Sequence, residues 1–326
     1  MISLVEQTIG ITNLQIILID DCSSDGTLEK LKHWEEKYSD SVTLIPLDEN
    51  VKQGAARNIA MPYVTGEYIC FLDSDDWLVK TALKKLYSFA KRERTDIVTY
   101  KSKEVLDYEP ADILTKTEIK DRLYVFGEAD EDKRAELVLK GDIPRGCWDK
   151  FFLTSFVKKY GFRFAEGVFD EESMFTIPAM LEAGRIYYCG ECLHRYFQNP
   201  EGTCIKLYSW PDNTHRDDNA ITWMNTYMFM NEKGLIEKHH DLFEALFVIN
   251  YFGRSLGLNA KRGCIFDAKT VNVMQDTVHA FFPDYKENKY EKDFMIYKNI
   301  STLIETPVDE TNIEDYNRKI RKSDII

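Results

Sequence analysis

The feature that most constrains the fold is an alternation of short apolar runs and helical patterns over the first hundred residues. Four runs have the length and β-branched content of buried strands, and they cover residues 14–19, 42–45, 68–72 and 97–100. Between the first two runs, Leu28, Leu31, Trp34 and Tyr38 recur at helical spacing. Strands that alternate with helices predict βαβ units on a mostly parallel sheet, and therefore an α/β fold.

Acidic residues follow two of these runs. Asp20 and Asp21 follow the first, and Asp73, Asp75 and Asp76 follow the third. Ligands of open α/β sheets bind beyond the carboxyl ends of the strands. Carboxylates that lie close together at a strand end can share Mg²⁺ or Mn²⁺, which neutralises a diphosphate leaving group. An isolated D-x-D is commonly a solvated acidic turn, but the strand before it and the helix after it favour a metal site.

Composition narrows the class of protein. The chain has 326 residues, 44% of them hydrophobic, which is enough for two domains with a sizeable core. The net charge of −13 argues against a nucleic-acid partner. No apolar run is long enough to span a membrane, and we expect no signal peptide. The seven cysteines, an odd number spread through the chain, indicate reduced thiols in a cytoplasmic protein.

The pattern changes in the second part of the chain. From about residue 206 it is mostly helical, with apolar residues at helical spacing over residues 223–230, 242–252 and 271–282. We therefore expect an α/β domain over residues 1–205 and a helical carboxyl-terminal region over residues 206–326.

Three stretches of the first domain share the order and spacing of motifs of glycosyltransferase family 2. They are residues 20–27 (DDCSSDGT), residues 54–58 (GAARN) and residues 66–77 (GEYICFLDSDDW). The sequence resembles that family over residues 1–205. The resemblance implies the GT-A fold and an inverting, metal-dependent glycosyltransferase of cell-surface glycan synthesis. Its partners would be a nucleotide-sugar donor and a saccharide or lipid-linked acceptor, at the inner membrane face in the latter case.

The resemblance also implies a donor site. The residues matched to the nucleotide sugar are Asp20, Asp21, Arg57, Asp73 and Asp75. The residues matched to the metal ion, Mg²⁺ or Mn²⁺, are Asp75, Asp73 and Asp76. For Arg57, the alternative interpretation is a surface ion pair, because such pairs are common and cost little.

A second region extends the resemblance to the acceptor side. Residues 148–152 (WDKFF) are similar to the family's W-N-K-L-Y segment, and residues 164–175 (FAEGVFDEESMF) to its F-x-E-G-x-x-F-E-D-x-x-F segment. The family's acidic pair there supplies the general base for the acceptor hydroxyl. Counting along the motif places Glu171 and Glu172 on that pair, with Glu172 as the base. Asp170 is the alternative if the loop shifts by one residue, and the three acids could also simply open a helix.

The sequence departs from the family at its beginning. Residues 3–8 (SLVEQT) match the end of the family's first helix, so the first strand and most of that helix are missing. We therefore expect the strand at residues 14–19 to have an uncovered edge. The alternative function is a truncated, non-catalytic protein that binds or scaffolds.

Three other interpretations of the sequence have weaker support. A phosphatase of the haloacid-dehalogenase type also has D-x-D at a strand end, but here Trp77 stands where Thr or Val is expected. A zinc site could be formed by three cysteines and a histidine whose spacing fits such a site only in part, Cys189, Cys192, His194 and Cys204. Two strands with a turn at residues 190–191 explain that segment more simply. A short basic tail over residues 318–322 offers only weak peripheral contact with an anionic membrane.

Overall fold

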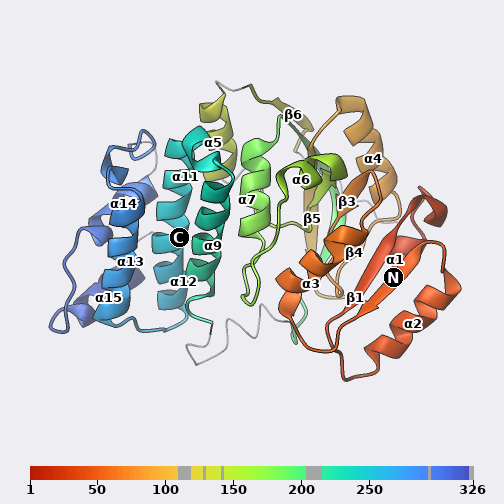
Figure 1. Cartoon of the computed structure of the whole chain (residues 1–326), viewed down its shortest axis with the longest axis horizontal. Coiled ribbons are helices and arrows are strands. Elements are labelled where there is room, and N and C mark those ends of the chain that lie inside the picture. Colours follow the sequence, from red (N-terminus) through yellow and green to blue (C-terminus); the bar gives the residue numbers. More distant parts are fainter. Residues whose placement is uncertain (109–118, 128–129, 141–142, 203–214, 293–294, 323–326) are drawn as a thin grey trace. The chain divides into compact units, whose positions relative to one another are not determined.

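The computed structural model describes residues 1–108, 119–127, 130–140, 143–202, 215–292 and 295–322. The chain divides into two compact units (Figure 1). The first comprises Met1–Gly167 and Glu171–Gly202, and the second comprises Val168–Asp170 and the chain from Thr203 onward. The boundary that we expected at residues 205–206 lies outside the described residues.

The first unit mixes strands and helices. Its strands are β1 (Ile16–Asp20), β2 (Val42–Pro46), β3 (Tyr68–Cys70), β4 (Trp77–Leu78), β5 (Ile97–Val105), β6 (Arg122–Val125), β7 (Lys150–Leu153) and β8 (Arg185–Phe197). Its α-helices are α1 (Ile2–Val5), α2 (Thr27–Lys37), α3 (Lys52–Ala60), α4 (Ala82–Glu93), α5 (Glu131–Leu139), α6 (Thr154–Tyr160) and α7 (Ser173–Glu182). The four predicted strands are confirmed, as β1, β2, β3 and β5.

The expectation of one mostly parallel sheet is wrong. Strands β1 and β2 pair in parallel in a two-stranded sheet of their own, with Ile16 opposite Val42. The larger sheet has the order β3-β7-β5-β8-β4, with β6 paired to β8. There, β5 and β8 are parallel, whereas β7 runs antiparallel to both of its neighbours. The alternation of local patterns could not reveal this, because β7 comes from a later segment and inserts between β3 and β5.

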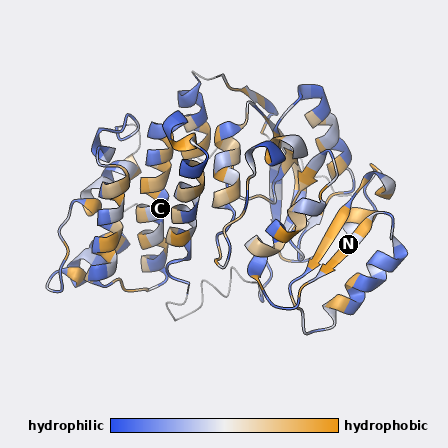
Figure 2. Ribbon diagram, in the orientation of Figure 1, coloured by the Kyte–Doolittle hydropathy of each residue, from blue (hydrophilic) through white to orange (hydrophobic). Residues whose placement is uncertain are grey.

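We expected the strand at residues 14–19, now β1, to have an uncovered edge, and its pairing agrees with this. Among the described residues, β1 pairs with β2 alone. Figure 2 shows β1 and β2 as largely hydrophobic ribbons beside the mostly hydrophilic α2. The first unit has its main core elsewhere, where α4 packs on the larger sheet through Leu83, Leu86, Val98 and Phe151.

Strand β8 replaces the two strands and turn that we expected. It runs without a break from Arg185 to Phe197. Its register against β5 shifts twice, because Tyr100 pairs with Cys189, Lys101 with Cys192 and Ser102 with His194. The intervening residues form a bulge, which requires glycine at position 190. A Cβ atom on Gly190 would lie 1.9 Å from the carbonyl oxygen of Ile119.

The second unit is helical where it is described, as expected. Its α-helices are α9 (Asp218–Glu232), α10 (Leu235–Lys238), α11 (His240–Phe247), α12 (Ser255–Lys261), α13 (Ala268–Phe281), α14 (Met295–Ile304) and α15 (Ile313–Lys322). A π-helical segment, Val248–Arg254, joins α11 to α12. Trp223, Phe243 and Phe247 are completely buried in its core. In the described parts of both units, no helix is long and apolar enough to span a membrane.

Candidate active site

Helix α3 carries the GAARN motif and packs against the loop that carries the predicted base. Gly54 allows this approach, because a Cβ atom there would lie 2.0 Å from the carbonyl oxygen of Ala165. Asn58 forms hydrogen bonds with Phe164 and Glu166 of the same loop. Its amide nitrogen donates to the carbonyl of Phe164 at 3.0 Å, and its amide oxygen accepts from the N–H of Phe164 at 2.9 Å. Two motifs that lie more than 100 residues apart in the sequence therefore form one structural element.

Arg57 bridges two acidic segments. Its guanidinium donates to Asp73 at 2.7 Å and also donates to Glu171. The Arg57 side chain is only 14% exposed and lies over the ring of Phe164. Burial by itself would lower the pKa of Arg57, but the surrounding acidic groups, Asp73 and Glu171 among them, raise it. Arg57 therefore forms an ion pair, but not one at the surface, because its side chain is 14% exposed and one of its partners, Glu171, is 4% exposed.

Glu171 and Glu172 differ in their surroundings although they are adjacent. Glu171 is buried with its side chain 4% exposed, and its carboxylate is occupied by Arg57. Glu172 is half-buried at the start of α7. Its Oε1 accepts from the backbone N–H of Cys147 at 3.1 Å and from the Cys147 thiol at 2.9 Å. Among the described residues, both donors to Glu172 contact Oε1 and none contacts Oε2, so that oxygen can take a proton.

Burial raises the pKa of both glutamates. For Glu171 the positive charge of Arg57 offsets part of this effect. For Glu172 the pKa is raised to about 7, mainly by burial and against the influence of Arg57. A general base works best when its pKa lies near the working pH. Glu172 therefore combines a base-like pKa with an oxygen atom that the fold does not use.

Asp170 lies in a different environment. Its backbone has a φ of 75°, which is unusual for a residue other than glycine. Its carboxylate accepts a hydrogen bond from the side-chain amide of Asn219 on α9. Asp170 belongs to the second unit, whereas Glu171 and Glu172 belong to the first. The structure therefore gives Asp170 a partner within the second unit.

The acids after β3 form a turn, because the N–H of Asp76 donates to the carbonyl of Asp73 at 3.1 Å. Asp73 is occupied by Arg57 through one oxygen. Asp75 is exposed, and its carboxylate accepts from the side chain of Asn199 at 3.2 Å. Oxygen donors at an exposed turn suit a hard cation such as Mg²⁺ or Mn²⁺.

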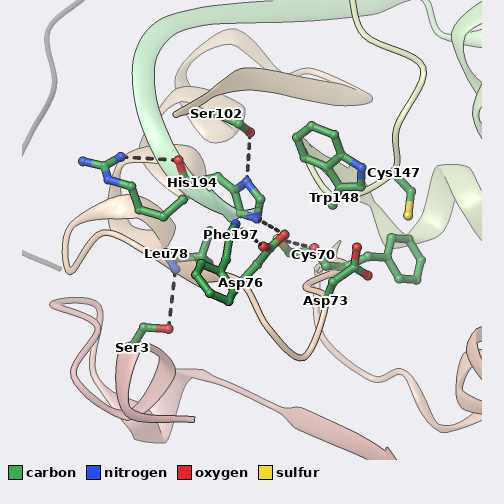
Figure 3. A network of polar contacts seen from close by, with 12 residues as sticks. Ser3, Cys70, Asp73, Asp76, Leu78, Ser102, Cys147, Trp148, His194 and Phe197 are labelled. Carbon is green, nitrogen blue, oxygen red and sulfur yellow. Dashed lines mark hydrogen bonds and ion pairs between the residues drawn. The ribbon is translucent and has the colours of Figure 1, made fainter. Parts of the chain in front are cut away.

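Asp76 is anchored within the fold. Its Oδ1 accepts from the backbone N–H of Phe197 at 2.8 Å, and its Oδ2 lies 3.0 Å from Nε2 of His194. Figure 3 shows the ring of His194 between Asp76 and Ser102, which contacts Nδ1 at 2.9 Å. The ring also stacks on Trp148, with 5.2 Å between centroids. Because His194 and Asp76 are both buried, their pairing holds the turn to β8.

The two acids at the end of β1, Asp20 and Asp21, have different hydrogen-bond partners. Asp21 caps the start of α3, where its carboxylate accepts from the N–H groups of Val51 at 2.7 Å and Lys52 at 3.0 Å. Asp20 is buried, and its Oδ2 accepts from the N–H of Ser23 at 3.1 Å. Its Oδ1 is buried without a hydrogen-bond partner in the described part of the chain. Buried acceptors are rarely left in this state, so Asp20 is the one of the pair that still has an oxygen without a donor.

The carboxylates fit a metal ion that is completed by other ligands. Over the described ranges, no three side chains of His, Cys, Asp or Glu come together as a closed metal site. Asp75 and Asp73 supply oxygen atoms only, and a cation there would take phosphate and water oxygens as its remaining ligands. Asp76 does not fit this role, because both of its oxygens contact other parts of the fold.

The zinc interpretation has no support in the described residues. Cys189 and Cys192 are buried free thiols on β8. The two ring nitrogens of His194 face Ser102 and Asp76. Cys204 lies outside the described residues.

Comparison with known proteins decides the family. Residues 2–152 match the family model described as glycosyl transferase family 2. Residues 2–152 therefore belong to glycosyl transferase family 2. The fold is GT-A-like, because the structure of Staphylococcus aureus TarS residues 1–349 with UDP is similar over 98% of this chain and 85% of that one. The TM-score is 0.66 and the identity 19%.

Curated relatives of this family 2 chain include three named transferases. It is 39% identical to a poly(ribitol-phosphate) beta-glucosyltransferase of Bacillus spizizenii over 101 residues, or 31% of this chain and 16% of the relative. It is 24% identical to TarS, a poly(ribitol-phosphate) beta-N-acetylglucosaminyltransferase of S. aureus, over 85% of this chain and 46% of the relative. It is 25% identical to a cholesterol galactosyltransferase of Borreliella burgdorferi, over 73% of this chain and 65% of the relative. The chain thus spans less than two thirds of each relative's length.

Two residues of the family 2 site escaped sequence reasoning. Cys147 contacts the predicted base, and its only signal in the sequence is that it directly precedes the WDKFF segment. The sequence suggested His194 only as a zinc ligand, whereas in the structure it contacts Asp76, the third acid of the D-S-D-D turn.

Proposed function

We propose that this chain is an inverting glycosyltransferase that moves a sugar from a nucleoside-diphosphate donor to a hydroxyl of a cell-surface glycan. The observation that carries the proposal is Glu172. It is a half-buried carboxylate with a pKa of about 7 and an unoccupied Oε2 among the described residues. Arg57 links the neighbouring Glu171 to Asp73 in the acidic turn. Arg57 therefore connects the segment that carries the proposed base to the turn proposed to bind the leaving group.

The donor site uses the two acidic strand ends. We assign the buried Oδ1 of Asp20 to an N–H of the nucleotide base, because that oxygen has no partner in the described residues. Uracil offers such a donor, and structures of TarS contain UDP and UDP-GlcNAc. Held by Asp75 and Asp73, Mg²⁺ or Mn²⁺ would neutralise negative charge on the diphosphate. We therefore propose a uridine diphosphate sugar as the donor.

The base completes the reaction on the acceptor side. A sugar or polyol hydroxyl is a weak nucleophile, so Oε2 of Glu172 takes its proton as the new bond to the anomeric carbon forms. The bond from that carbon to the diphosphate oxygen breaks on the opposite face, and the nucleoside diphosphate leaves. The configuration inverts, and no covalent enzyme intermediate is required. Glu172 then returns the proton to water.

The acceptor class follows from the relatives. Two of them are named for poly(ribitol-phosphate), so we propose a polyol-phosphate chain within the broader class of saccharide and lipid-linked acceptors. We propose that the reaction takes place in the cytoplasm, at the inner membrane face if the acceptor is lipid-linked. Free thiols at all six cysteines in the described part of the chain agree with a reducing compartment.

Calorimetry with a panel of nucleoside diphosphates, with and without Mn²⁺, tests the donor site. We expect UDP to bind more tightly in Mn²⁺ than in EDTA. Transfer from UDP-sugars to poly(ribitol phosphate) then tests the reaction. If no nucleotide binds in a metal-dependent way and no transfer occurs, the non-catalytic binding or scaffold function is correct instead.

A further inference from the structure

Cys147 makes two contacts with the proposed base from a single position. Its backbone N–H lies 3.1 Å and its sulfur 2.9 Å from Oε1 of Glu172. The side chain is completely buried. Burial and the charge of Glu172 raise the pKa of Cys147 well above its usual value. The group therefore stays a thiol, and its S–H donates to the carboxylate.

The loop that presents Cys147 is held without help from the cysteine side chain. Lys150 is buried, and its ammonium group donates to the carbonyls of Pro144 and Gly146. Gly146 lies against the indole of Trp148, where a Cβ atom would be 2.7 Å from Nε1. Trp148 in turn stacks on His194, and Figure 3 shows Cys147 beside Trp148. Changing the thiol should therefore remove a donor and leave the loop in place.

We propose that Cys147 is a positioning residue for the base, and that its thiol holds Oε1 of Glu172 so that Oε2 accepts the proton. This inference rests on the proposed function, in which Glu172 is the base. A donor to the ionised carboxylate stabilises that form. The thiol therefore helps keep Glu172 ionised, although the carboxylate is half-buried.

Other groups around Glu172 act on the same equilibrium. Arg57 favours the ionised carboxylate. Glu171 and Asp73 disfavour it, and so does burial. Since these groups remain when position 147 changes, the protonation of Glu172 should shift only by the contribution of the thiol. That shift should be upward in pH when the donor is lost.

The test compares Cys147→Ala with Cys147→Ser, which differ from each other by one hydroxyl group. The profile of kcat/KM between pH 5.5 and 9.5 is measured for both variants and for the parent. For Cys147→Ala, the acid limb should move up by about 0.5 to 1 pH unit, the size expected for loss of one hydrogen bond. Transfer then falls by about three- to tenfold at pH 6 and recovers by pH 9. Cys147→Ser should keep the parental midpoint.

A second measurement does not need activity. The dependence of the unfolding free energy on pH reports the pKa of Glu172, and it should shift in Cys147→Ala but not in Cys147→Ser. If both variants share the parental midpoint, or if both lose activity equally at every pH, the positioning role is wrong. Glu172→Gln separates this failure from failure of the proposed function. A Glu172→Gln variant that transfers normally would refute the base itself.

Discussion

Two short acidic runs, residues 73–76 and residues 170–172, can be compared directly. Each contains one acid that pairs with Arg57, Asp73 in the first run and Glu171 in the second. The shared arginine partly compensates the cost of burying Glu171 and of half-burying Asp73. One cation therefore links the two runs, and neither run can be understood from its own residues.

Each run also contains one acid whose side chain contacts a residue from another element. Asp76 contacts His194 on β8, and Asp170 accepts a hydrogen bond from Asn219 on α9. By residue type alone, Asp76 and Asp170 could serve equally well as metal ligands or as bases, but their carboxylates are engaged in these contacts. The comparison teaches that partners, and not residue type, separate structural from reactive acids.

The remaining acids, Asp75 and Glu172, differ in exposure. Asp75 is exposed, and Glu172 is half-buried with a raised pKa of about 7. An exposed carboxylate suits a cation, whereas a sheltered one with a pKa near 7 suits a proton. Four predictions test this division, from the largest expected effect to the smallest.

Glu172→Gln should have the largest effect. It keeps the shape of the side chain but removes its basicity, so transfer should fall by about 10²- to 10⁴-fold with donor binding nearly unchanged. Glu171→Gln should cost less, because Glu171 is occupied by Arg57. Rates and UDP affinities of both variants, with Asp170→Asn as control, are measured at pH 8. Near-parental transfer by Glu172→Gln together with an inactive Asp170→Asn would make Asp170 the base.

Arg57→Met should come next. It leaves the buried Glu171 and the half-buried Asp73 without their counter-charge, so the free energy of unfolding should drop by about 3 to 5 kcal/mol at pH 7. The drop should shrink at pH 4, where Glu171 is protonated because burial raises its pKa. Denaturant unfolding measures both values. A second substitution, Glu171→Gln, should recover part of the loss, and full stability of Arg57→Met alone would show that the bridge contributes little.

Asp75→Asn and Asp76→Asn should differ in what they lose. Asp75→Asn should fold normally but bind UDP about 10- to 100-fold more weakly in Mn²⁺, as expected for removal of a charged ligand. Asp76→Asn should lower the melting temperature, because it weakens the contact with His194. Calorimetry and thermal unfolding distinguish the two outcomes. Equal UDP affinity of Asp75→Asn and the parent in Mn²⁺ would remove Asp75 from the metal site.

The smallest effect concerns stability and pH. The pKa of Glu172 rises from an ordinary 4.5 to about 7 on folding, so the folded state binds the proton more tightly than the unfolded state. The resulting stabilisation is present below pH 4.5 and is lost as pH rises through 7. Glu172→Gln should therefore be more stable than the parent by about 1 to 3 kcal/mol at pH 8, and equal to it at pH 4. Parallel stability curves for the two proteins would contradict the raised pKa.

The sequence by itself determined the family and the local elements. The strands β1, β2, β3 and β5 were predictable because buried strands have a short apolar run bounded by turn residues. The helical character of the second unit was predictable from its periodicity. The three family motifs, with their order and spacing, pointed to the GT-A fold before any coordinates.

Only the tertiary structure decided how these elements combine. Strand β7 lies between β3 and β5, and Glu171 meets Arg57 across 114 residues of sequence. The capping of α3 by Asp21 and the anchoring of Asp76 by His194 likewise depend on distant partners. Local periodicity reports which face of an element is buried, but not what covers it. For a carboxylate, the covering group determines whether it caps a helix, pairs with a cation or retains an oxygen for chemistry.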